Sequence, residues 1–238
     1  MSDSFLYLGG LAVAGYFYWI WLGDYRANAK AIRARSANRQ DHTPQPSGSA
    51  VDTLPGLPGA TPVKGSFIAL AVLGALGILA VEVAGEYRLD VVEDQTTMSV
   101  LLGIYTLAAA FIEELIFRGF LFFDRHGKWQ LWGSILLISL LFAVIHPYLW
   151  SYQVPENQPP WLFWRYLGLN LWKESGELNI QPIFATLILF MNSLWFYLVR
   201  LLPKNRYRSL IPCIAAHMAS NLGVFLVKAC QGKVELFS

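Results

Sequence analysis

The chain has 238 residues, of which 55% are hydrophobic and only 14% are charged. This composition and a mean hydropathy of +0.42 exclude an ordinary soluble globular protein and indicate a membrane protein. A formal net charge of +2 is too small to indicate nucleic acid as a partner, so the positions of the basic residues carry more information than their sum.

Apolar stretches of membrane-spanning length recur along the whole chain. We expect transmembrane helices at Phe5–Leu22, Ser66–Gly85, Ser99–Phe123, Leu131–Trp150, Ile180–Val199 and Ser209–Val227. Tyr and Trp residues are frequent where these stretches meet polar segments, as in the aromatic belts of membrane proteins. The predicted fold class is therefore all-α, a polytopic bundle of about six transmembrane helices.

The first apolar stretch does not resemble a cleaved signal peptide, because Asp3 precedes it and no small-residue cleavage site follows it. We expect residues 1–23 to form an N-terminal transmembrane anchor, appended to the core rather than part of it. Residues 24–65 follow as a basic, alanine-rich helix and a Pro/Gly-rich linker. The basic helix is expected to lie on the cytoplasmic lipid surface or, as an equal alternative, to be solvated and only to enforce topology. The membrane-embedded core would then comprise residues 66–238.

The distribution of basic residues predicts the orientation of the bundle. If the chain alternates across the membrane, one side holds Arg26, Lys30, Arg33, Arg35, Arg39, Lys64, Arg125, Lys128, Arg200, Lys204, Arg206 and Arg208. The other side holds only Arg88, Arg165, Lys173, Lys228 and Lys233. We therefore expect the N-terminus outside and the linker in the cytoplasm. This bias and the small size of the chain favour a bacterial plasma membrane.

The outer segment 151–179 contains prolines followed by a tryptophan-rich stretch, Trp161–Trp172, which is too short to span a bilayer. We expect it to lie at the membrane interface. A structural aromatic anchor is favoured over a lid that covers a site.

The third apolar stretch contains three ionisable residues, Glu113, Glu114 and Arg118. Placing an ionised side chain at the centre of a transmembrane helix costs about 2.5–3.5 kcal/mol, so each needs a partner or a function. Glu114 and Arg118 are four residues apart with the acid on the favourable N-terminal side, which predicts a structural ion pair. Glu113 points about 100° away around the helix and has no local counter-ion, so it is the candidate for chemistry.

The fourth stretch contributes His146, followed by Pro147. If the third and fourth helices form an antiparallel hairpin about the polar turn 124–130, Glu113 and His146 lie at similar depth, to within a turn or two. Pro147 disfavours regular helix at the residue before it and removes a backbone hydrogen bond, which could orient His146.

The last stretch contributes His217 and Asn221, again four residues apart and so on one face of a helix. Such a pair alone is an ordinary way to satisfy buried polar groups. One carboxylate, two imidazoles and an amide on apolar helices are most simply satisfied by a common polar cavity.

The patterns Glu-Glu-x-x-x-Arg, Phe-x-x-x-His and His-x-x-x-Asn, in this order on separate helices, resemble the three motifs of the CAAX-protease and bacteriocin-processing family of intramembrane proteases. The resemblance covers residues 99–228. It implies a helical membrane core in which the motif residues converge in an intramembrane cavity, and hydrolysis of a peptide bond. It also implies that Glu113 and His146 activate water and that His217 and Asn221 stabilise the oxyanion. We expect no cofactor, with zinc as the alternative below.

Two alternatives remain open. Glu113, His146 and His217 could bind zinc as a His₂Glu site with water as the fourth ligand, although the sequence has no His-Glu-x-x-His motif. A non-catalytic membrane immunity or scaffold protein could keep the polar cavity for recognition. We favour the glutamate mechanism over zinc because the His-Glu-x-x-His motif is absent. We favour an enzyme over a scaffold because a scaffold has little reason to leave Glu113 without a local counter-ion. The expected partners are membrane lipids and a membrane-anchored peptide or protein substrate, and prenylation of that substrate is not specified by the sequence.

Overall fold

The computed structural model describes residues 3–38, 54–93, 95–121, 123, 127–152, 167–172 and 176–236. Its helices are α1 (Asp3–Asn38), α2 (Gly65–Arg88), α3 (Val100–Glu113), the π-helical η1 (Glu114–Phe120), α4 (Lys128–Ile145), the short 3₁₀ helix η2 (Pro147–Leu149), α5 (Ile180–Leu201) and α6 (Ile211–Cys230). Within the described residues, six helical segments, with α3 and η1 counted as one, are long and apolar enough to cross a membrane. The predicted all-α membrane fold is thereby confirmed.

The chain divides into two compact units. The first unit consists of Met1–Leu79, Thr96–Phe122 and Trp195–Ser238, and the second of Ala80–Gln95 and Phe123–Leu194. Helices α2 and α5 therefore contribute residues to both units. Glu113, Glu114, Arg118, His217 and Asn221 belong to the first unit, and His146 belongs to the second.

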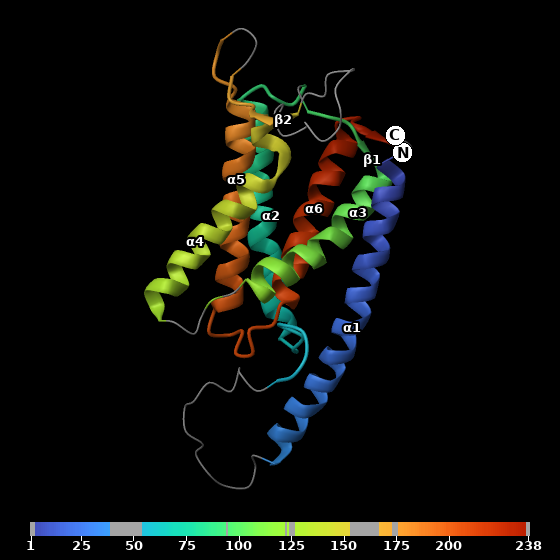
Figure 1. Cartoon of the computed structure of the whole chain (residues 1–238), viewed down its shortest axis with the longest axis vertical. Helices are drawn as coiled ribbons and strands as arrows, with labels where there is room; N and C mark the ends of the chain where they lie inside the picture. The colour runs from blue at the N-terminus through green and yellow to red at the C-terminus, as the bar shows by residue number, and fades with distance from the viewer. Residues whose placement is uncertain are drawn as a thin grey trace. The chain divides into compact units, whose positions relative to one another are not determined.

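Helix α1 packs along α3 in the first unit (Figure 1). The Tyr7 and Tyr105 ring centroids are 5.3 Å apart. Further along α1, the rings of Tyr18 and Trp21 lie edge-on to the Phe111 ring, with centroid distances of 5.6 and 6.0 Å. Trp21 is only 5% exposed. These aromatic contacts pack α1 against α3 within the first unit, and the expectation that residues 1–23 form an anchor appended to the core stays a prediction.

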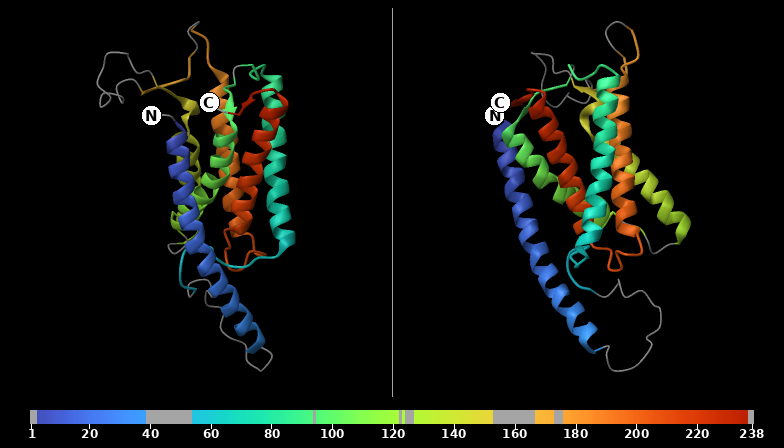
Figure 2. Two further views of the ribbon diagram at one scale, coloured as in Figure 1. Left: turned by 90° about the vertical axis from the view of Figure 1, so that its right-hand side faces the viewer. Right: turned by 180° about the vertical axis from the view of Figure 1, so that it is seen from behind.

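Helix α1 continues without a break through the basic stretch as far as Asn38, and its C-terminal turns project beyond η1 and α6 (Figure 2). Its polar face holds the end of the linker. Asp24 Oδ2 accepts from Leu57 N at 2.8 Å, and Asn28 Nδ2 donates to Ala60 O at 3.0 Å. The linker residues 39–53 lie outside the described residues.

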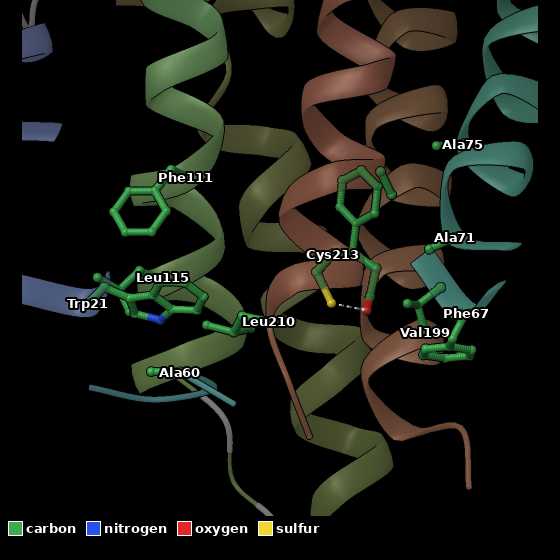
Figure 3. Close-up of a cluster of buried hydrophobic side chains, with 12 residues drawn as sticks. Trp21, Ala60, Phe67, Ala71, Ala75, Phe111, Leu115, Val199, Leu210 and Cys213 are labelled. Atoms are coloured by element: carbon green, nitrogen blue, oxygen red, sulfur yellow. Dashed lines mark hydrogen bonds between the residues drawn. The ribbon is translucent and has the colours of Figure 1, made fainter. Parts of the chain in front are cut away.

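A buried apolar cluster joins α1, α2, the α3–η1 helix, α5 and α6 within the first unit (Figure 3). Small side chains allow these helices to approach closely, as is usual between membrane helices. Ala71, Ala75 and Ala216 are fully buried, and the Cys213 thiol donates to Phe196 O at 3.2 Å. This packing brings α6 against the polar segment of the third apolar stretch.

The described residues also form two short, two-stranded sheets. The parallel pair β1 (Met98–Ser99) and β4 (Val234–Glu235) joins the start of α3 to the chain after α6. Ser99 also caps α3, because its hydroxyl accepts from Leu102 N at 3.2 Å. In the second unit, β2 (Trp150–Tyr152) pairs antiparallel with β3 (Leu167–Leu169).

The expected interfacial segment is only partly described. Residues 153–166 and 173–175 lie outside the described residues, so its role as an anchor or a lid stays a prediction. The hairpin turn is also only partly described, because residues 124–126 lie outside the described residues, so the hairpin that would bring Glu113 and His146 to similar depth stays a prediction.

Candidate active site

The third apolar stretch changes its helix type at the paired glutamates. Glu113 is the last residue of α3 and Glu114 the first of η1. In this wider helix Leu121 N donates to Ile116 O, five residues back, at 2.8 Å. The Tyr197 hydroxyl then donates to Phe117 O, the carbonyl that an α-helix would pair with Leu121, at 2.5 Å. Such π-helical segments are frequent at functional sites.

Glu114 and Arg118 form an ion pair inside η1. Arg118 Nη1 lies 3.0 Å from Glu114 Oε1, and both side chains are fully buried. The Arg118 guanidinium also lies 5.1 Å from the centroid of the Phe196 ring and 5.2 Å from that of Tyr197. These two aromatic rings, both on α5, stabilise the guanidinium cation by cation–π attraction.

Glu114 has a second partner that the sequence did not reveal. His217 Nδ1 lies 2.9 Å from the same Oε1 atom. The imidazole stacks on the Phe196 ring, with centroids 5.0 Å apart and planes inclined by 24°. A bond on its edge and an aromatic ring on its face thus hold His217 in one orientation.

Glu113 has a different environment from its neighbour. Its side chain is 30% exposed, and its Oε2 lies 3.8 Å from His217 Nε2, which is too long for a hydrogen bond. In the described part of the chain, this Oε2 is buried without a hydrogen-bond partner. Glu113 therefore stands outside the ion pair and next to the nitrogen of His217 that faces away from Glu114.

Asn221 lies one turn after His217 on α6. Its Nδ2 donates to Thr106 O of α3 at 2.9 Å, and the amide keeps a second N–H for another acceptor. Both residues of the third motif are thereby oriented by polar groups of the same α3–η1 helix.

His146 stands at the C-terminal end of α4, not inside a helix. The apolar stretch suggested helix as far as Trp150, but α4 ends at Ile145, and His146 is extended at φ −71° and ψ 147° because Pro147 follows it. Its Nδ1 lies 2.6 Å from Phe142 O, and Trp150 Nε1 donates to Val144 O at 2.7 Å.

A carbonyl can only accept, so His146 Nδ1 carries the hydrogen of that bond, and in the neutral ring Nε2 has a free lone pair. The ring is thereby prepared to accept a proton at Nε2. Its convergence with Glu113 in one cavity stays a prediction.

The zinc alternative also stays a prediction. Within the described parts of the chain, no three His, Cys, Asp or Glu side chains are grouped as metal ligands would be. Glu113 and His217 lie together in the first unit, whereas the third expected ligand, His146, is in the second.

Comparison with known families gives a match over the part of the chain that contains these residues. A family model for type II CAAX prenyl endopeptidases, Rce1-like, matches residues 95–223, which is more than half of the chain. No curated protein and no solved structure matches the chain. The matched range contains all six candidate residues and excludes α1 and the linker.

Proposed function

Because the chain belongs to the Rce1-like family of type II CAAX prenyl endopeptidases, we propose that it is an intramembrane endopeptidase that hydrolyses a membrane-associated peptide. The observation that carries this proposal is the contrast between the two glutamates. Glu114 is bonded to Arg118 and His217, whereas Glu113 is partly exposed and lies outside the ion pair. A carboxylate that stands outside such a pair can accept a proton.

In this scheme Glu113 and His146 activate water. The water oxygen attacks the carbonyl carbon of the scissile bond while its proton passes to the Glu113 carboxylate, with His146 Nε2 as the second acceptor. The carbon–nitrogen bond then breaks, and the proton is returned to the leaving amine. The hydrogen on His146 Nδ1, which leaves a lone pair on Nε2, supports the role of His146, and Glu113 Oε2, which has no hydrogen-bond partner among the described residues, supports that of Glu113.

The negative charge that develops on the carbonyl oxygen needs hydrogen-bond donors. We assign that role to Asn221, through the Nδ2 hydrogen that does not bond Thr106, and to His217, through Nε2. Both side chains are held by α3 and η1 before substrate binds, so little reorganisation is needed at the transition state.

C-terminal CAAX-like peptides, with and without a prenyl group, are the first substrates to test. Purified protein in lipid vesicles is incubated with a panel of membrane-anchored peptides, and cleavage is read by mass spectrometry. We expect turnover by the wild type and loss of turnover in Glu113→Gln and His146→Ala. Glu235→Gln is the matched control, because this exposed carboxylate is on β4, at the opposite end of α3 from Glu113.

A folded wild type that cleaves no peptide of the panel would favour the non-catalytic alternative. Full turnover by Glu113→Gln would overturn the assignment of the base. We further propose a bacterial plasma membrane as its location, with the orientation that the basic residues predict.

A further inference from the structure

We propose that Glu114 is a positioning residue for His217, in addition to its role as the counter-ion of Arg118. The proposal rests on the proposed peptidase function and on one atom, Glu114 Oε1, which lies 3.0 Å from Arg118 Nη1 and 2.9 Å from His217 Nδ1. The side chains of Glu114 and Arg118 are fully buried, and that of His217 is 9% exposed. Water therefore has little access with which to replace either contact.

The contact with Glu114 determines which nitrogen of His217 carries a hydrogen. A carboxylate paired with a guanidinium is ionised and can only accept hydrogen bonds. His217 Nδ1 must therefore be the donor, and Nε2 is the nitrogen presented toward Glu113, 3.8 Å from its Oε2. A flip of the ring would place Cδ2 against Glu114, and a change of tautomer would place a bare nitrogen there, so either change loses this charge-assisted bond.

This arrangement has a consequence for the proposed oxyanion role. In the neutral ring with hydrogen on Nδ1, Nε2 has a lone pair and cannot donate, so His217 donates to an oxyanion only when Nε2 also carries a hydrogen. The Glu114 carboxylate at Nδ1 stabilises that doubly protonated ring, in the way that a buried acid orients a catalytic imidazole and stabilises its cation. Glu114 thus acts on the reaction through His217 without contact with the substrate.

A purely structural Glu114 makes a different prediction, and a pair of double variants separates the two. Glu114→Met with Arg118→Met removes both charges and leaves no acceptor for His217 Nδ1. Glu114→Gln with Arg118→Met removes the same charges but keeps an amide oxygen as acceptor. We expect both proteins to fold with near wild-type thermal stability, because no orphan charge remains.

Turnover should differ between the two double variants. We expect kcat to fall at least tenfold with the methionine pair while KM stays within about twofold, and to fall less with the glutamine pair. Ser36→Ala is the control, because it removes a side-chain hydrogen bond to Ile32 O on the exposed end of α1 and leaves the Glu114–His217 contact in place. It should keep wild-type kcat.

A spectroscopic measurement supports the kinetic one. In protein labelled with ¹⁵N-histidine, the His217 signal, assigned by its loss in His217→Gln, should show hydrogen on Nδ1 in the wild type and a tautomer mixture in the methionine pair. If that pair fails to fold, the glutamine pair decides, because its amide can accept from Nδ1 or donate to it and should also give a tautomer mixture.

The outcomes separate the two proposals. The positioning role would be overturned by wild-type kcat in the methionine pair, or by an unchanged His217 tautomer in every folded Glu114 variant. In that case, loss of turnover in Glu113→Gln would still support the proposed peptidase function. Absence of cleavage by the wild type would overturn the peptidase instead, and the tautomer measurement would still test the Glu114–His217 contact.

Discussion

Two adjacent glutamates in one apolar helix have different chemical surroundings. Glu114 is paired with Arg118 and bonded to His217, whereas Glu113 is partly open and, among the described residues, reaches only His217 Nε2, at 3.8 Å. An uncompensated charge in a buried site is unfavourable, so a residue kept in that state is the one from which we expect chemistry.

Replacing each glutamate alone should separate stability from activity. Glu114→Gln leaves Arg118 buried without its counter-ion, which typically costs about 3–5 kcal/mol, so the unfolding temperature in detergent should fall. Glu113→Gln leaves no orphan cation, so stability should hold or rise while turnover falls about 10²-fold or more. Thermal unfolding and peptide turnover are measured on the same preparations. Equal losses of stability in the two variants would mean that the carboxylates are assigned wrongly.

The response to chelators distinguishes the glutamate mechanism from the zinc alternative. If Glu113 and His146 activate water without a metal, a metal-free preparation treated with a strong chelator should keep its full turnover. Elemental analysis of the same preparation provides the control. Stoichiometric zinc, with turnover lost on its removal and regained on its return, would instead support ligation by Glu113, His146 and His217.

Spacing rules predict contacts within one helix but not contacts between helices. The structure shows the Glu114–Arg118 pair that the four-residue spacing indicates. The Glu114–His217 contact joins residues 103 positions apart, and it depends on how α6 packs against η1 and Phe196. The sequence contains both residues, but no periodicity specifies that they meet.

At the level of elements, the apolar stretches predicted where helices exist better than where they end or change type. The switch from α3 to the π-helical η1 has no signal in the apolar pattern, since it depends on an outside donor, the Tyr197 hydroxyl, for the carbonyl of Phe117. The end of α4 was signalled by Pro147, which restricts His146. Length and hydropathy alone extended that helix to Trp150.

The role of α1 could not be deduced from hydropathy, because a lipid-facing side chain and a core side chain are equally apolar. Trp21 packs against Phe111 and is only 5% exposed, whereas Trp19 is 71% exposed. Trp21→Ala should therefore destabilise the protein by about 3–5 kcal/mol, as large cavities do, and Trp19→Ala should have little effect. Thermal unfolding of the two variants is the measurement. Equal unfolding temperatures would instead support the prediction that α1 is an appended anchor.

For the whole molecule, composition and the positions of the apolar stretches were sufficient to predict a six-helix membrane protein, and the family match supports a peptidase. The length of α1 adds a constraint on how the chain crosses the bilayer. Its 36 residues correspond to about 54 Å of helix, which exceeds the roughly 30 Å hydrocarbon core. Its basic C-terminal turns must therefore project beyond the apolar core on the side where the linker begins.

The two native cysteines allow the orientation to be tested with few changes. With the N-terminus outside and six spans, the exposed Cys230 at the end of α6 should face outward, whereas the buried Cys213 should stay unlabelled. A membrane-impermeant maleimide added to intact cells should therefore label the wild type at Cys230. In a Cys230→Ala background, Pro55→Cys in the exposed end of the linker should be labelled only after permeabilisation. Labelling of Pro55→Cys in intact cells would invert the topology and place the basic end of α1 outside, against the distribution of positive charge from which the orientation is predicted.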